Sequence, residues 1–279
     1  MAVLWGGAWP TGKLAVEDVT PGVVATVRFG LSAVLLWLWA RALATPLARP
    51  TRADIPLVLV LGITAIAGYN LLFLYGLSLA PASDGAIIVP GLAPVMTALL
   101  AVPLLGERLS GRVALGLLTG IAGLVLVVDL GGGLDSDRLL GDLLFVAGAV
   151  VWGVYSVVGK EATARFGAVG ATLYATAAGT AMLVPFSALE GGWGDLADAD
   201  AAAWISIVYL AVFATVLGFV LFYEGVRRIG PSSAMSFALL VPVFGVLSSV
   251  VVLDERLGAS TVAGGVVVLA GLWLVLRRG

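Results

Sequence analysis

Residues 94–109 read PVMTALLAVPLLGERL, and residues 242–257 read PVFGVLSSVVVLDERL. In each stretch a proline opens a long apolar run that ends, thirteen residues later, in Glu-Arg-Leu. The two prolines are 148 residues apart. Neither stretch is specific alone, but the ordered pair indicates that one apolar unit of membrane-spanning length occurs twice in the chain.

The residues around these stretches recur at almost the same spacing. Near the amino terminus Trp5 and Lys13 have counterparts in Trp152 and Lys160, each 147 residues later. The other recurring residues are Gly6, Leu72, Phe73, Gly76, Gly116 and Gly123 in the first half, and Gly153, Leu221, Phe222, Gly225, Gly264 and Gly271 in the second. The sequence therefore predicts two copies of one unit, over residues 1–130 and 139–279.

The composition places the chain in a membrane. Hydrophobic residues make up 61% of its 279 residues, charged residues 11%, and the mean hydropathy is +1.11. A soluble domain has roughly 25% charged residues. The chain contains no Cys and no His, which excludes Cys nucleophiles, His acid–base pairs and the ligands typical of zinc, copper, haem and iron–sulfur sites. We expect no cofactor and no metal.

Apolar segments of about 20 residues, the length that crosses a bilayer, cover almost the whole chain. Pro, Gly and charged residues separate ten of them. Their predicted bounds are residues 1–16, 22–40, 55–77, 82–105, 113–128, 139–159, 169–189, 203–224, 233–253 and 261–276. The first is short, because its helix would measure ~24 Å against a hydrocarbon core of ~30 Å.

The charges between the spans indicate how the chain crosses the membrane. With the amino terminus in the cytoplasm, eleven of the 15 Lys and Arg residues fall in cytoplasmic loops and two in outer loops, while Lys13 and Arg28 lie within spans. This bias favours ten spans with both termini cytoplasmic. Because five spans per unit is an odd number, the second unit enters the membrane upside down. Inverted repeats are typical of transporters that work by alternating access.

Three motifs carry a family resemblance: Leu4-Trp5-Gly6-Gly7-Ala8-Trp9 in the first span, Arg28-Phe29 in the second, and the repeated Pro-x12-Glu-Arg-Leu signature. With them the chain resembles the EamA-like family of the drug/metabolite transporter superfamily over nearly its whole length. The resemblance implies an all-α integral membrane protein of ten transmembrane helices, arranged as two inverted five-helix repeats. It also implies a small-metabolite or drug permease of the bacterial cytoplasmic (inner) membrane, commonly an exporter of amino acids or related compounds. The chain departs from its own repeat pattern at Ala175, which stands where the first repeat has Arg28.

Residues of the first, third and sixth spans are the candidate substrate-binding residues, because repeat symmetry places these spans, with the eighth, around one cavity. They are Trp5, Trp9, Lys13, Tyr69, Asn70, Phe73, Trp152, Tyr155 and Ser156. Aromatic walls with a few polar groups suit amphipathic metabolites. Anchoring at the lipid headgroups is the alternative for the rings, and snorkelling is the alternative for Lys13. Trp37, Trp39, Trp204 and Trp273 are expected to be such anchors.

Arg28 lies about two turns inside the second span, where a lone guanidinium requires a partner. Asp84, near the outer end of the fourth span, is the predicted partner in a structural clamp or gate, and Glu17 and Asp18 are looser candidates. Direct binding of a carboxylate substrate is the alternative to a clamp. Pro90, Pro94 and Pro242 lack a backbone donor and are predicted to kink the fourth and ninth spans, either as hinges or only to shape the bundle.

Small residues and loop acids complete the predicted packing. Gly116 and Gly120 in the fifth span, with Gly264 and Gly271 in the tenth, are expected to pack helices within or between protomers, so a homodimer is one expectation. Glu107 and Glu255 are expected to brace the loops that hold them. Asp84 and Glu224 are the carboxylates expected near span ends, and Asp142, at the start of the sixth span, is counted with the acids on the outer side. The coupling ion is therefore left open.

Other classes of protein fit this sequence less well. A membrane-embedded enzyme needs clustered acids for a metal, or a base beside a nucleophile, and the sequence offers no such cluster. A receptor or scaffold needs extramembrane segments longer than these loops. We expect a transporter and not an enzyme, with a small-molecule substrate and the lipid bilayer as partners and no nucleic acid. Uptake of the metabolite is the main alternative to export.

Overall fold

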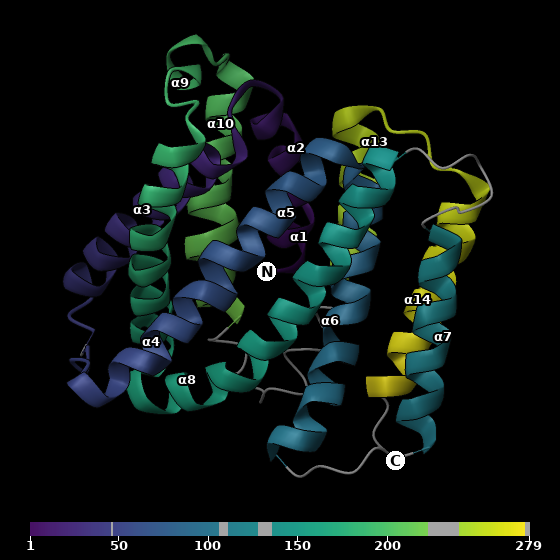
Figure 1. Ribbon diagram of the computed structural model, residues 1–279, viewed down its shortest axis with the longest axis horizontal. Coiled ribbons are helices and arrows are strands. Elements are labelled where there is room, and N and C mark those ends of the chain that lie inside the picture. The colour runs from purple at the N-terminus through teal and green to yellow at the C-terminus, as the bar shows by residue number, and fades with distance from the viewer. Residues whose placement is uncertain (46, 106–110, 128–135, 223–239, 277–279) are drawn as a thin grey trace.

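A computed structural model describes residues 1–45, 47–105, 111–127, 136–222 and 240–276 of the chain. The helices, shown in Figure 1, are α1 (Ala2–Gly6), α2 (Ala8–Asp18), α3 (Pro21–Ala42), η1 (Arg52–Asp54), α4 (Ile55–Leu61), η2 (Gly62–Ala67), α5 (Gly68–Leu79), α6 (Ala82–Leu105), α7 (Gly111–Val127), α8 (Ser136–Glu190), α9 (Asp195–Asp198), α10 (Ala201–Tyr209), η3 (Leu210–Leu217), α13 (Leu240–Leu253) and α14 (Ala259–Leu276).

These helices follow the predicted spans. Five segments are long and apolar enough to cross a bilayer, namely Pro21–Ala42, Arg52–Leu79, Ser136–Gly159, Glu161–Glu190 and Ala201–Phe222. Shorter apolar helices at Ala82–Thr97, Ala114–Val127, Leu240–Leu253 and Ala259–Gly271, together with α1 and α2, stand where the other five spans are expected. The chain is thus an all-helical membrane protein of about ten helices.

Two predicted spans are joined in α8. The helix is continuous from Ser136 to Glu190 except at Gly167, whose φ of +68° lies in the left-handed region that glycine adopts without steric cost. In Figure 1 the first half of α8 slants across the molecule, and the second half stands beside α3. The bend at Gly167 therefore takes the place of a loop between the sixth and seventh spans.

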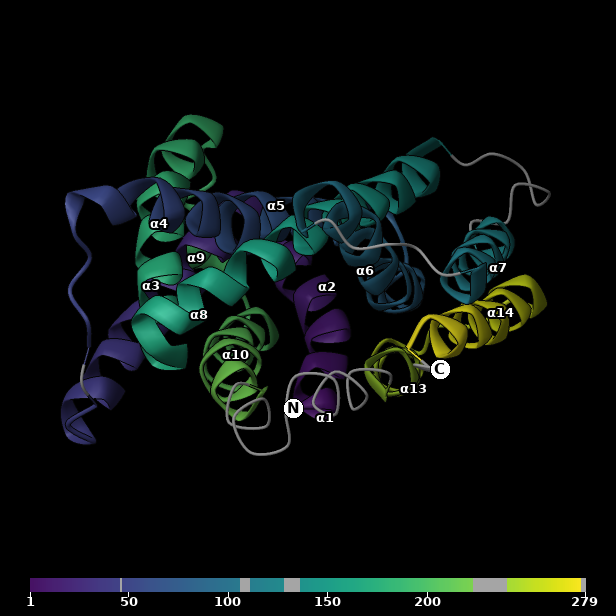
Figure 2. The ribbon, with the colours of Figure 1, turned by 90° about the horizontal axis from the view of Figure 1, so that it is seen from below.

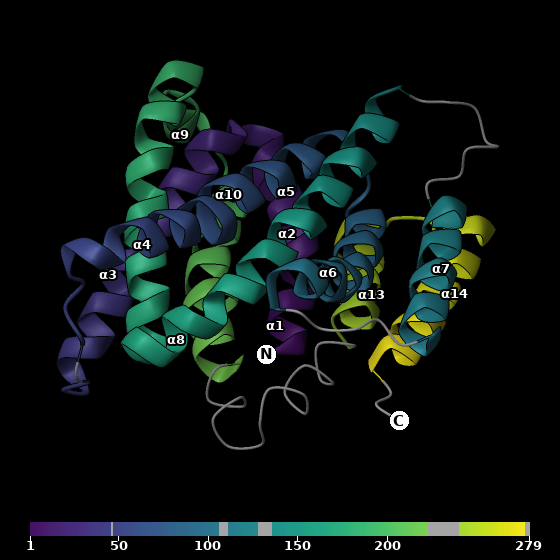
Figure 3. The same ribbon diagram turned by 60° about the horizontal axis from the view of Figure 1, so that its bottom comes forward.

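Equivalent helices of the two repeats pack against each other in opposite directions. A Cβ atom added to Gly271 of α14 would lie 2.7 Å from the Gly116 carbonyl oxygen of α7, and one added to Gly264 would lie 2.6 Å from that of Gly123. The later residue of α14 thus meets the earlier residue of α7, so the two helices are antiparallel. Figures 2 and 3 show this pair at one edge of the molecule. The antiparallel pairing is the geometry of an inverted repeat.

The second and seventh spans meet in the same way. The Thr26 hydroxyl of α3 lies 3.1 Å from that of Ser187 near the end of α8. Farther along α3, a Cβ atom at Gly30 would lie 3.8 Å from the methyl group of Thr180, which comes earlier in α8. These helices are therefore antiparallel as well.

Loops are tied together at the end of the bundle where α2 and α5 end and α3 and α6 begin, the end predicted to face outward. The Glu255 carboxylate accepts hydrogen bonds from the backbone N–H groups of Ala82 and Ser83, at 2.8 and 3.1 Å. It thereby caps α6 and braces the loop, as expected. The hydroxyl and backbone N–H of Thr20 donate to Asp195, and these hydrogen bonds hold the pKa of Asp195 below its usual range. Glu107 lies outside the described residues.

The outer surface of the bundle is apolar. Of the four tryptophans expected to anchor the chain, Trp37, Trp204 and Trp273 are exposed, whereas Trp39 is half-buried. The Arg41 guanidinium lies 5.3 Å from the centre of the Trp37 ring. Large side chains such as Phe29 and Phe145 fill the interior instead. The rings considered next are therefore distinct from the anchoring set.

Candidate functional site

Aromatic side chains from the first, third and sixth spans meet where the two repeats adjoin. Trp5 and Trp152, which are repeat counterparts, approach edge to face with ring centroids 6.3 Å apart. Tyr69 lies 4.9 Å and Tyr155 lies 5.3 Å from the Trp152 ring. Because edge-to-face and tilted pairs are favourable arrangements of rings, these contacts stabilise the junction of the repeats.

The ring contacts continue from Tyr69 toward the end of the bundle that is predicted to face outward. Tyr69 stacks on Phe73 with centroids 6.1 Å apart, and Phe73 meets Trp9 at 4.9 Å. Six predicted residues therefore form one connected group, which we call the aromatic cluster: Trp5, Trp9, Tyr69, Phe73, Trp152 and Tyr155.

Three further rings extend the aromatic cluster and were not predicted from the sequence. Phe219 and Phe222 lie 5.5 and 5.4 Å from Trp5, and Phe145 lies 5.8 Å from Trp9. Phe222 could have been found, because it is the repeat counterpart of the candidate Phe73. Phe145 and Phe219 have no aromatic counterpart, so nothing in the repeat pattern marked them.

The polar atoms of two candidates bind backbone carbonyls. The indole N–H of Trp5 donates to the Ala214 carbonyl at 3.0 Å, which links α1 to the eighth span. The Ser156 hydroxyl donates to the Trp152 carbonyl one turn earlier in the same helix, at 2.8 Å. Trp5 is thus fixed in orientation by the other repeat, whereas Ser156 bonds locally.

Lys13 binds the end of a neighbouring helix. Its Nζ donates to the carbonyls of Leu77 and Ala80 at 2.6 and 3.3 Å, at the carboxyl end of α5. A cation is stabilised there because the last carbonyls of a helix have no partners within it. In the structure Lys13 therefore caps α5.

The third and eighth spans each contain a π-helical segment. These are η2 and η3, which begin at Gly62 and Leu210, 148 residues apart. Wide turns of this kind leave carbonyls without their usual partners and occur often at functional sites. Side chains supply the missing donors here: Asn70 Nδ2 donates to the Ala65 and Ile66 carbonyls, both at 3.0 Å, and the Thr215 hydroxyl donates to the Leu210 carbonyl at 2.9 Å.

Arg28 links Asn70, which follows η2 at the start of α5, to Thr215 of η3. Its Nη1 donates to Asn70 Oδ1 at 3.2 Å, and its Nε and Nη2 donate to the Thr215 hydroxyl at 3.4 and 3.3 Å. The guanidinium carbon lies 4.6 Å from the centre of the Phe29 ring. Only 6% of Arg28 is exposed. A buried cation is thus held between the repeats by neutral groups, an arrangement that we call the Arg28 bridge.

The predicted pair of Arg28 with Asp84 is wrong. Asp84 Oδ2 lies 2.8 Å from Nη2 of Arg138 and 3.0 Å from its Nε. Arg138 was assigned to a loop, but α8 already begins at Ser136, so Arg138 stands in the first turn of that helix and reaches α6. The Arg28 side chain is instead directed to Asn70 of α5 and Thr215 of η3.

The three prolines that were predicted to kink helices lie within the helices expected for the fourth and ninth spans. Pro90 and Pro94 are inside α6, which continues from Ala82 to Leu105, and Pro242 is buried near the start of the described part of α13. Their role as hinges stays a prediction.

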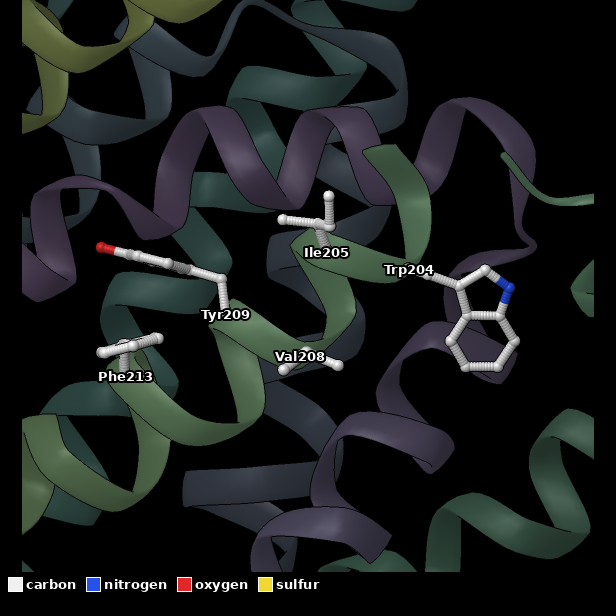
Figure 4. A pocket seen from close by; sticks show the side chains of 5 residues that line it. All are labelled: Trp204, Ile205, Val208, Tyr209 and Phe213. Carbon is white, nitrogen blue, oxygen red and sulfur yellow. The ribbon is translucent and has the colours of Figure 1, made fainter. Parts of the chain in front are cut away.

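A shallow pocket of about 320 Å³ lies apart from the aromatic cluster. Figure 4 shows its lining, which comes entirely from α10 and η3: Trp204, Ile205, Val208, Tyr209 and Phe213. Most of these side chains are exposed apolar groups on the outer surface. A hollow lined by one helix and open to the outside suits a lipid chain better than a transported solute.

Comparison with known proteins gives a consistent result. The profile of the EamA-like transporter family matches residues 1–129 and again residues 139–277. The "Uncharacterized transporter YyaM" of Bacillus subtilis is 28% identical over 97% of this chain and 89% of its own. A protein of Streptantibioticus cattleyicolor, "Probable terminal-alkyne amino-acid exporter", is 29% identical over 99% of this chain and 91% of its own.

A solved structure shares the fold. It is a crystal structure that superposes with a TM-score of 0.67, covers 98% of this chain and 95% of its own, and is 23% identical in sequence. At that identity the likeness concerns the fold alone.

Proposed function

Because the chain belongs to the EamA-like transporter family, we propose that it exports a small amphipathic metabolite, an amino acid or a related compound, by alternating access. The two repeats, residues 1–130 and 139–279, are the halves that move against each other. In this proposal the protein lies in the bacterial cytoplasmic membrane with both termini in the cytoplasm, as the distribution of Lys and Arg favours.

The aromatic cluster is the observation on which this proposal rests. It lies where the repeats adjoin, so rings contributed by both halves would separate and meet again as the access side changes. Rings combined with the Asn70 amide and the Arg28 guanidinium offer an apolar wall beside polar groups, which suits an amphipathic solute. The name of the Streptantibioticus relative supports an amino acid as the cargo.

The experiment compares two tryptophans in a bacterial host that lacks its own amino-acid exporters. Release of amino acids, nucleosides and cationic drugs into the medium is measured for the wild type, Trp152→Leu and Trp204→Leu. Trp152 contacts four rings of the cluster, whereas Trp204 is exposed on the outer surface. We expect Trp152→Leu to slow release about tenfold, because lost ring pairs amount to roughly 1 kcal/mol or more, and Trp204→Leu to leave it unchanged.

Two outcomes would contradict the proposal. Equal release by both variants, at equal amounts of protein in the membrane, would remove the cluster from the transport path. Accumulation of the solute inside the cells would indicate uptake. A homodimer stays a prediction, since the glycines expected at an interface pack α7 on α14 within the chain.

A further inference from the structure

A buried carboxyl group near the outer end has no hydrogen-bond partner. Asp142 stands in the second turn of α8, and only 1% of it is exposed. Both of its carboxylate oxygens are buried, and no group in the part of the chain that the structure describes donates to either. Burying an ionised carboxylate without donors costs far more than a hydrogen bond returns. The Asp142 carboxylate is therefore stable at this buried position only if a cation, a proton included, neutralises it.

The neighbouring charges do not supply that cation. Asp84 on α6 and Arg138, one turn before Asp142 on α8, act on it electrostatically. Arg138 is already engaged, because its guanidinium binds Asp84 and reaches the Val127 carbonyl at 3.5 Å. Two carboxyl groups thus share one arginine. Because Arg138 binds Asp84, it does not hydrogen-bond Asp142.

The other charged groups near Asp142 do not neutralise its carboxylate. The Lys13 ammonium caps the end of α5, against which the neighbouring Gly141 packs. The Glu255 carboxylate caps α6 beside Asp84 and adds negative charge. Asp137 lies exposed at the start of α8. The surroundings therefore favour a neutral Asp142.

We propose that Asp142 is a proton-binding site of the outer gate, so that closing the outer end takes up one proton from the outside medium. When the outer end opens, Asp142 meets water and releases the proton from its carboxyl oxygen. When the end closes, the carboxyl group is reprotonated and buried beside the ion pair of Asp84 and Arg138. The proposal rests on the alternating access proposed above, but its test needs no knowledge of the cargo.

The test follows the opening of the outer end with a single cysteine, which the absence of native cysteines allows. Ser83→Cys places a thiol at a buried position of α6, and Ser136→Cys places a reference thiol at an exposed one. Each is labelled in intact cells with a membrane-impermeant maleimide over a range of outside pH. The labelling rate at residue 83 is divided by that at residue 136. This ratio removes the pH dependence that comes from ionisation of the thiols.

The closed form binds one proton more than the open form, so opening is favoured as the pH rises. The ratio of rates should rise with outside pH, by up to about tenfold per pH unit. Asp142→Asn, which is neutral at every pH, should make the ratio independent of pH, and Asp137→Asn should leave the wild-type profile intact. Asp84→Asn frees Arg138 to pair with Asp142, so it should also flatten the profile; this second variant decides the matter if Asp142→Asn does not reach the membrane.

Three results would overturn the proposal. They are a wild-type ratio that does not change with pH, a pH dependence that survives in Asp142→Asn, and a ratio that follows the sodium concentration at constant pH. The last would assign the site to a metal cation. Failure of transport by the wild type toward every cargo tested would affect the proposed function and leave these labelling results standing.

Discussion

The two repeats meet in two places of opposite character. Along α7 and α14 the contact is a seam of glycines, where backbone atoms of one helix touch those of the other at Gly123 and Gly264. Between the first repeat and η3 the contact is the Arg28 bridge, made of side-chain hydrogen bonds 3.2 to 3.4 Å long. The seam leaves no room for rearrangement, whereas long bonds to neutral partners can be exchanged at little cost.

The difference is also one of symmetry. Both repeats contribute equivalent glycines to the seam, but only the first contributes the arginine, since Ala175 occupies the corresponding place in the second. A contact that both copies keep is suited to a fixed axis about which the halves turn. A contact that one copy alone supplies can favour one conformation over its inverted counterpart. We therefore expect damage to the seam to affect folding and damage to the bridge to affect transport.

The largest effect is expected from a methyl group in the seam. In Gly264→Ala the new Cβ would lie 2.6 Å from the Gly123 carbonyl oxygen and 2.7 Å from the Val127 nitrogen, both backbone atoms of α7. The helices must move apart, at a cost of about 2–3 kcal/mol. Thermal unfolding in detergent should show a clearly lowered Tm.

Gly111→Ala is the matched control, because nothing lies within 4 Å of a Cβ at that position. Its Tm should equal that of the wild type. Equal Tm values for both variants would mean that α7 and α14 are not in close contact in the membrane protein.

The next effect is expected from removing the charge of the bridge. Arg28→Met keeps most of the side-chain volume, and replacing a buried ionic group by a well-packed apolar one is often neutral for stability. Tm should therefore change little, while export should fall about tenfold, which corresponds to the hydrogen bonds of one charged group. Normal export by Arg28→Met would reduce the bridge to a packing contact.

The glycine seam and the aromatic cluster could be predicted from the sequence, whereas the Arg28 bridge could not. Glycines and rings recur at a fixed spacing, so the repeat pattern alone places them on equivalent spans. The π-helical segments η2 and η3 consist of small or apolar residues with one threonine each, and no residue type marks the wider turn. Because these segments could not be predicted, Asn70 and Thr215 could not be recognised as the partners of Arg28.

The assignments near the outer end failed for a related reason. Counting charges places acids and bases on one side of the membrane, but it does not tell whether a charge near a span end is exposed. Asp142 was counted with the acids on the outer side, yet it stands six residues after the start of α8 and is buried. The depth of a residue near a helix end depends on where the helix begins, and boundaries are the least certain part of a sequence-based prediction.

The smallest effect is expected from the hydroxyl on the second-repeat side of the bridge. Thr215→Val keeps the shape of the side chain but removes the acceptor for Arg28 Nε and Nη2 and the donor for the Leu210 carbonyl. The bond of Arg28 to Asn70 survives. The loss of about 1 kcal/mol should slow export roughly fivefold.

Thr119→Val is the matched control, since the Thr119 hydroxyl bonds only the Leu115 carbonyl one turn earlier on the exposed face of α7. It should export at the wild-type rate. If Thr215→Val also exported normally while Arg28→Met did not, the arginine would act through Asn70 and the first repeat alone. The bridge would then not join the two halves, and the contrast with the glycine seam would have to be abandoned.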